Sequence, residues 1–430
     1  MEARSAIPPA RPCGACSTVP LAWLRALALL LASAVSNAVY LGFSSIIAET
    51  AHWMQVSPGA VDALVPLSNV GTFSGYLFVG SLIDRIGVAA TFTAGVLVSA
   101  AGCALRVCGA VSLDFQLLAV GQFVANVGSS FLNALPAPLA VRNFPPGLHG
   151  AATALGNVGM VIGSFGGPLL GCAFESQPAK LVWLHFFACV AIVPTTALFG
   201  GSCIRQESPN EILSVHAENS QVESMCGRTR CLFHQAGFVP LLMGSTAGTT
   251  VANAYPSALQ QLACAVPGIS TRQLSAILAV CGLVGPLAAG HVADRSSAWH
   301  VLVLAALLTA SGSLICLLAW MLVLPVLVTA GWIVVCLFGV GAIPVLSFVA
   351  AAEAVPAMEG TASGMLNLFS AMGSLAAQSV ITVLLHEQGC HVNKARMLIL
   401  GWTLVAWTAV VALACAVRAR RLSEVSRCST

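Results

Sequence analysis

The chain has 430 residues, of which 58% are hydrophobic and only 8% are charged, and its formal net charge is +3. Soluble domains carry roughly 25% charged residues, so a soluble fold of this size could not cover its surface with so few. The positive charges are spread along the chain, which excludes the basic surface that nucleic-acid binding requires. The composition therefore indicates an integral membrane protein in contact with a lipid bilayer.

Roughly 20 consecutive apolar residues cross a bilayer as a helix, and the sequence contains twelve such runs. The first run is longer than the core of a signal peptide and is not followed by a cleavage site, so we interpret it as a retained span. The runs predict an all-α membrane protein with twelve transmembrane helices at 21–48, 60–83, 88–110, 115–141, 151–174, 181–203, 236–263, 272–293, 298–320, 324–350, 361–385 and 396–417.

The longest polar stretch, 204–234, lies between the sixth and seventh runs and predicts a cytoplasmic linker. It divides the chain into two six-helix bundles, 21–203 and 235–417, with cytoplasmic tails at 1–20 and 418–430. An even number of spans puts both termini on one side. With that side cytoplasmic, 13 of the 18 Lys and Arg residues are internal, as the positive-inside rule requires. We expect a multi-pass monomer in the plasma membrane or an endomembrane.

The two halves share an internal repeat. A shift of 210 residues aligns GSLIDR, which begins at Gly80, with GHVADR, which begins at Gly290. The same shift aligns a second motif, because Pro146, Gly150, Ala152, Asn157, Gly163 and Ser164 fall on Pro356, Gly360, Ala362, Asn367, Gly373 and Ser374. One offset that serves two distant motifs predicts parallel six-helix repeats related by an axis along the membrane normal.

The motif Gly80-x-Leu82-x-Asp84-Arg85-x-Gly87 resembles the loop between spans two and three of the major facilitator superfamily. The runs SNAVY (36–40), GQFVANVGSSFLNALPAPLA (121–140) and GNVGMVIGSFGGP (156–168) resemble the heme/choline-type carriers related to the feline leukaemia virus subgroup C receptor. The resemblance implies the twelve-helix fold of that superfamily and transport by alternating access.

The repeated Asp-Arg pairs predict the gates of such a carrier. A carboxylate can cap the N-terminus of a neighbouring helix. The two-fold repeat would bring Asp84 to the start of span eleven near Gly360, and Asp294 to the start of span five near Gly150. With Arg85 and Arg295, these residues are candidate gating residues, whose contacts form in one state and break as the halves rock. The alternative is that the pairs set topology by charge alone.

Polar residues in the spans predict a substrate site at the middle of the membrane, between the halves. Span one and span seven each have a polar break, with Asn-Ala-x-Tyr in the first and Asn-Ala-Tyr in the second. On span four a polar stripe could instead join helices to one another. The candidate substrate-binding residues are Asn37, Tyr40, Asn126, Asn157, Asn253, Tyr255 and Asn367.

A site of tyrosines and amides suits a neutral solute, or a cation held by cation–π contact. In the resembled carriers choline is held by an aromatic cage and by a glutamine in span five. Tyr255 matches a cage tyrosine, whereas Leu41 replaces the span-one tryptophan and Val158 replaces the glutamine. Haem would need an iron ligand or basic groups, which the predicted cavity lacks. We therefore expect a small polar or cationic organic solute, such as choline or ethanolamine.

The charged residues of the spans lie at their ends, Arg106 among them, whereas proton-coupled carriers need a titratable group inside the membrane. Facilitated diffusion is therefore the favoured interpretation. The alternatives are a proton-coupled carrier of monocarboxylates or amino acids, a heme transporter, and a non-transporting receptor or scaffold. Walker, H-E-x-x-H and G-x-S-x-G motifs are absent, so we expect neither an enzyme nor a cofactor or metal site.

Overall fold

The computed structural model describes residues 19–200, 229–230, 232–233, 238–246, 266–355 and 358–385, and all regular elements in these parts of the chain are helical. Eight of the described helices are long and apolar enough to cross a membrane. One of them, Pro58–Ser112, contains both the second and the third expected span. Most of the span expected at 236–263, and all of that at 396–417, lies outside the described residues.

The first half of the chain forms α1 to α8. The helices are α1 (Val19–Leu41), α2 (Ile47–Met54), α3 (Pro58–Asp62), α4 (Leu64–Ser112), α5 (Phe115–Asn133), α6 (Pro136–Asn143), α7 (His149–Ala173) and α8 (Pro178–Ile192). Short 3-10 segments precede α7 (Pro146–Leu148) and follow α8 (Val193–Phe199). The described part of the second half contains α12 (Thr271–Ala293), α13 (Ala298–Met321), α14 (Pro325–Val334), the π-helical segment η3 (Val335–Ala342), α15 (Ile343–Ala354) and α16 (Glu359–Leu385).

Local sequence explains most of the helix boundaries. The side chain of Asp114 caps α5 by accepting hydrogen bonds from the backbone N–H groups of Gln116 and Leu117, at 2.9 and 3.2 Å. Spans two and three meet at Gly87, whose φ of 86° and ψ of 170° lie in a region open mainly to glycine. The span expected at 115–141 is present as Phe115–Asn143, but it is interrupted where the chain turns at Ala134 and α6 starts with Pro136.

Small residues bring the helices of the first half close together. Four glycines of α7 recur every four residues and face the backbone of α1, so that Gly159 meets Leu30, Gly163 meets Ala34, Gly167 meets Ala38 and Gly171 meets Gly42. A Cβ atom at Gly159, for example, would lie 2.9 Å from the Cα of Leu30. Helices in membranes associate through such close packing of small residues, because lipid supplies no hydrophobic driving force between them.

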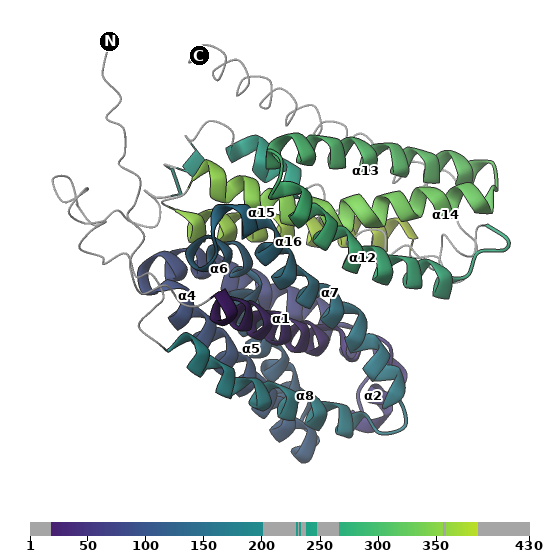
Figure 1. Ribbon diagram of the computed structural model, residues 1–430. Helices are drawn as coiled ribbons and strands as arrows, with labels where there is room; N and C mark the ends of the chain where they lie inside the picture. The colour runs from purple at the N-terminus through teal and green to yellow at the C-terminus, as the bar shows by residue number, and fades with distance from the viewer. Residues whose placement is uncertain are drawn as a thin grey trace, which may run out of the picture.

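The helices form two groups that lie close together at one end and diverge toward the other (Figure 1). One group contains α1 to α8, and the other contains α12 to α16. The groups touch mainly through α4 with α16 and α7 with α12, with smaller contacts of α15 and α16 on α6 and of α15 on α7. The contacts of α7 with α12 run from Gly150 and Gly290 to Val161 and Gly282.

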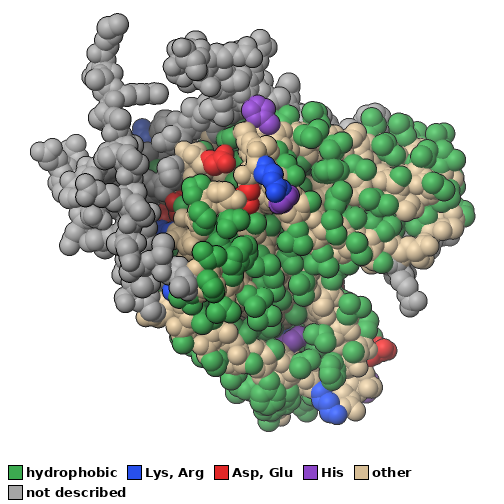
Figure 2. Space-filling view, in the orientation of Figure 1, with side chains coloured by type: hydrophobic (Ala, Val, Ile, Leu, Met, Phe, Trp, Pro, Cys, Tyr) green, Lys and Arg blue, Asp and Glu red, His purple; other side chains and the backbone are tan. Residues whose placement is uncertain are grey.

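Large apolar side chains cover much of the outer surface, and charged side chains are few on the face shown in Figure 2. Exposed examples from different helices include Phe78 at 60%, Leu169 at 70% and Val326 at 77%. Continuous apolar surface of this kind, in a chain with so few charges, is what contact with lipid requires.

Candidate transport and gating sites

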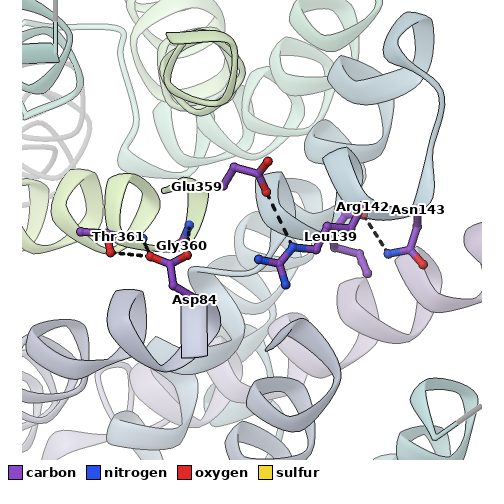
Figure 3. Close-up of polar contacts among 7 residues, drawn as sticks. All are labelled: Asp84, Leu139, Arg142, Asn143, Glu359, Gly360 and Thr361. Carbon is purple, nitrogen blue, oxygen red and sulfur yellow. Dashed lines mark hydrogen bonds and ion pairs between the residues drawn. The ribbon is translucent and has the colours of Figure 1, made fainter. Parts of the chain in front are cut away.

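The carboxylate of Asp84 connects the two halves. It lies at the end of the second span and points toward the first turn of α16 (Figure 3). Its Oδ1 accepts a hydrogen bond from the backbone N–H of Gly360, and its Oδ2 accepts one from the N–H of Thr361, both at 3.0 Å. The hydroxyl of Thr361 also donates to Oδ2. Asp84 thus satisfies donors that the start of α16 would otherwise leave unpaired.

Asp294 makes the equivalent contact with the first half. Its Oδ1 accepts a hydrogen bond from Gly150 N–H at 2.7 Å, and its Oδ2 accepts one from Ala151 N–H at 2.9 Å. These donors belong to the first turn of α7, which is related to the first turn of α16 by the 210-residue repeat. We call Asp84 with Gly360 and Thr361, and Asp294 with Gly150 and Ala151, the capping contacts, and the end of the molecule that holds them the capped end.

Glycines beside each carboxylate allow the helices to approach. A Cβ atom at Gly80 would lie 2.9 Å from the carbonyl oxygen of Gly360 and 2.9 Å from the Cα of Thr361. At Gly290 it would lie 2.8 Å from the carbonyl carbon of Gly150. Because backbone atoms cannot yield as a flexible side chain can, the glycines of both motifs are required for the carboxylates to reach the helix ends.

The arginines of the two motifs lie apart from these contacts. Arg85 and Arg295 are both exposed, and within the described part of the chain they form no ion pair with a residue of the other half. Instead Arg142, in the last turn of α6, lies 3.7 Å from a carboxylate oxygen of Glu359, beside Asp84 (Figure 3). The 210-residue repeat puts His149 where Glu359 stands, so this ion pair between the halves has no equivalent at Asp294.

The two predicted site residues of α1 belong to one polar cluster at the end of that helix. Asn37 donates hydrogen bonds to Ser33 O at 2.8 Å and to Asn133 Oδ1 at 3.1 Å. Tyr40 donates its hydroxyl to Asn69 Oδ1 at 2.9 Å. Both side chains are half-buried, and they connect α1 to α5 and α4.

Gln122, which sequence reasoning did not select, holds the end of α1. Its side-chain amide lies 3.2 Å from Val39 O, 3.3 Å from Tyr40 O and 2.8 Å from Ser68 Oγ. It is 1% exposed, so it occupies the interface between α1, α4 and α5. The signal was present as a polar stripe on span four, which also contains Asn126 and Asn133.

The other described asparagines of the predicted site bond to their own helices. Asn126, Asn157 and Asn367 each donate to the carbonyl four residues earlier, at 2.8, 2.9 and 3.1 Å. Asn126 and Asn157 are buried, at 1% and 4% exposure, and Asn367 is half-buried. The structure therefore does not gather all seven predicted residues around one described cavity. Asn253 and Tyr255 lie outside the described residues.

The sequence also failed to show a buried basic pair. Arg106, expected near an external span end, is 0% exposed, and its Nη1 lies 3.3 Å from Nδ1 of His185, which is 2% exposed. Arg25, expected among the internal basic residues, is likewise 0% exposed and donates to Leu198 O and Asn143 Oδ1. Both arginines lie near the ends of their helices, as expected, but the sequence did not show that they are buried.

Comparison with known proteins gives the family of this architecture. The model of the Major Facilitator Superfamily matches residues 26–378. Solute carrier family 49 member A3 of Danio rerio is 24% identical over 288 residues, 64% of this chain and 59% of that protein. The uncharacterized MFS-type transporter C09D4.1 of Caenorhabditis elegans is 23% identical over 388 residues, 87% of this chain and 66% of that protein. The chain spans less than two thirds of the length of these curated relatives.

Solved structures show the same fold. A variant of the E. coli fucose:proton symporter FucP has a TM-score of 0.70 at 16% identity, over 93% of this chain and 98% of that one. A bacterial homologue of the iron transporter ferroportin, in its outward-facing state, has a TM-score of 0.70 at 14% identity, over 93% and 99%. With the family model covering most of the sequence, these matches show that the chain is a membrane transporter of the major facilitator superfamily and not an enzyme.

Proposed function

We propose that this transporter moves a small polar or cationic organic solute by alternating access, as a monomer and without ion coupling. The observation that carries the proposal is the pair of capping contacts, each of which connects a carboxylate of one half to a helix start of the other. The internal repeat provides this contact twice, at the end where the two bundles lie close together. Such a pair of contacts is suited to closing that end reversibly.

The gating step follows from the chemistry of the capping contacts. A carboxylate at a helix N-terminus contributes about 0.3–1 kcal/mol, and up to ~2 kcal/mol when partly buried. Two such contacts are strong enough to favour one state and weak enough to break during turnover. We assign gating to Asp84, Asp294, Gly150 and Gly360. Arg85 and Arg295 then set the side of the membrane by their charge.

The proposed solute site lies between α1 and the span expected at 236–263. Asn37 and Tyr40 supply an amide and a phenol at the end of α1, and we assign the same roles to Asn253 and Tyr255, which lie outside the described residues. Asn126, Asn157 and Asn367 contribute to the lining of the proposed site, each held by a hydrogen bond to its own helix. Neutral amides fix a polar solute, and tyrosine rings attract a quaternary or primary ammonium by cation–π contact.

The capped end faces the cytoplasm in this proposal, and both termini lie there. The basis is the unequal distribution of Lys and Arg between the two sides of the expected topology. The membrane is the plasma membrane or an endomembrane.

A proton-coupled carrier of monocarboxylates or amino acids is the second candidate. The buried pair of Arg106 and His185 favours it, because an ionisable side chain within the membrane marks a functional site by default. A heme transporter and a non-transporting receptor or scaffold have no comparable observation among the described residues.

The test is uptake of labelled choline and ethanolamine into proteoliposomes, with and without a pH gradient. We expect saturable uptake that ignores the gradient and that falls at least about tenfold in Tyr40→Ala and Tyr255→Ala. The matched control is Ser74→Ala, which removes a hydroxyl that bonds only to Val70 O of its own helix among the described residues. Uptake that follows the pH gradient would favour the second candidate, and no uptake of either amine by folded protein would exclude a choline-like solute.

A further inference from the structure

Two pairs of side chains join α4 to α8 inside the first bundle. Cys103 and Cys189 approach with their Sγ atoms 3.4 Å apart. Three residues along α4, Nη1 of Arg106 lies 3.3 Å from Nδ1 of His185, which stands four residues before Cys189 on α8. All four side chains are at most 4% exposed.

The positive charge of Arg106 is not balanced by any described carboxylate, because the one described ion pair within 4.0 Å joins Arg142 to Glu359. Its guanidinium carbon lies 4.9 Å from the centroid of the Phe43 ring. Its Nε and Nη2 atoms are buried without a hydrogen-bond partner, and so is Nε2 of His185. A buried, unpaired charge is costly, so the site requires a counter-charge.

The groups around Arg106 include no described carboxylate, although the thiols of Cys103 and Cys189 lie close enough to interact with its charge. The turn after α1 contributes Gly42 and Phe43, and α5 contributes Gly121, whose Cβ would lie 2.9 Å from Cγ of Arg106. On α8 the ionisable neighbours are His185 and Cys189, and on α4 the neighbour is Cys103. No described carboxylate therefore lies within 4.0 Å of the guanidinium.

The unpaired atoms are arranged as a binding site. Nε and Nη2 form one edge of a guanidinium, and the two parallel N–H groups of that edge bind carboxylates in a fork. His185 occupies Nη1 through its Nδ1, and it leaves the edge of Nε and Nη2 free. We propose that this edge of Arg106, held in place by His185, binds one small monovalent anion, either a free inorganic anion or the carboxylate of a carried solute.

The site adjoins the proposed solute site. The ring of His185 lies directly against Gly42, where a Cβ atom would be 3.3 Å from Nε2, and Gly42 follows Tyr40 by two residues. A bound anion would neutralise the cluster and remove its repulsion of a cationic solute. The site does not depend on the solute being a cation, because binding can be measured on the purified protein without transport.

The experiment follows thermal unfolding of the purified full-length protein at constant ionic strength. The reference anion is isethionate, a sulfonate much larger than chloride, and it is replaced by chloride in one series and by acetate in the other. We expect a saturable rise of about 2–4 °C in the midpoint with at least one small anion. A response to chloride identifies a free inorganic anion, and a response to acetate alone identifies a carboxylate.

The response should vanish in Arg106→Gln and persist in Lys180→Gln, which removes an exposed positive charge from the start of α8. If Arg106→Gln does not fold, Arg106→Lys keeps the charge without the fork and should bind acetate about tenfold more weakly. The proposal is overturned if neither anion stabilises the wild-type protein, or if the arginine variants respond as the wild-type protein does.

Discussion

At the scale of the residue, a negative charge placed at a helix start explains why so apolar a chain keeps Asp84 and Asp294. Each carboxylate accepts hydrogen bonds from two consecutive backbone N–H groups of the opposite half. An asparagine in the same place keeps one acceptor oxygen but loses the charge that interacts with the helix dipole.

We therefore predict that Asp84→Asn weakens the closed capped end by about 1 kcal/mol, an approximately fivefold change in its population. The maximal rate of solute uptake should change with it. The control is Asp62→Asn, which neutralises an exposed carboxylate of α3. Equal uptake rates in Asp84→Asn, Asp62→Asn and wild type would show that the contact has no part in turnover.

At the scale of the element, the regular glycines of α7 determine how closely α1 can pack. Gly163 faces Ala34 and Asn37, where a Cβ would lie 2.7 Å from the Cβ of Asn37. Gly166, three residues away, has open space around it. The two positions therefore form a matched pair on one helix.

Gly163→Val should destabilise the first bundle by about 1–3 kcal/mol, because the added side chain separates α1 from α7. Gly166→Ala should be neutral or slightly stabilising, since alanine favours a helix and nothing obstructs it. Thermal unfolding of the two purified variants would measure this difference in stability. Equal midpoint temperatures would mean that α1 does not pack on the face of α7 that contains Gly163.

Gln122 anchors the end of α1 to α4 and α5, and Gln122→Leu should lower stability by about 1–3 kcal/mol by leaving buried polar groups unpaired. Gln116→Leu is the matched control on the same helix, because that side chain is exposed. Midpoint temperatures of the two variants measure the difference. A similar loss in both would mean that Gln122 does not hold α1.

The sequence predicted the helical elements better than their interruptions. Apolar runs of the right length predict spans, and a constant offset of 210 residues pairs Asp84 with the region of Gly360 and Asp294 with that of Gly150. A run of apolar residues does not predict how helices pack on one another. The break before Pro136 and the hydrogen bond from Tyr40 to Asn69 depend on that packing. Arg106 and His185 are 79 residues apart and meet only because α4 packs on α8.

At the scale of the whole molecule, the two halves touch mainly through α4 with α16 and α7 with α12, and the capping contacts lie at one end of both interfaces. Because the same motif contributes to both interfaces, opening the capped end requires both carboxylates to leave their helix starts. The contacts should therefore act together, and the loss of both charges should have a larger effect on the conformational equilibrium than the loss of either.

The most direct test is a distance measurement across the capped end by double electron–electron resonance, with spin labels placed through an unnatural amino acid at Ser81 of α4 and at Ser296, just after α12. We predict a distribution dominated by the short distance in the wild-type background, and a shift toward a longer distance in the variant that combines Asp84→Asn and Asp294→Asn. Identical distributions in the two backgrounds would contradict a gating role for the capping contacts.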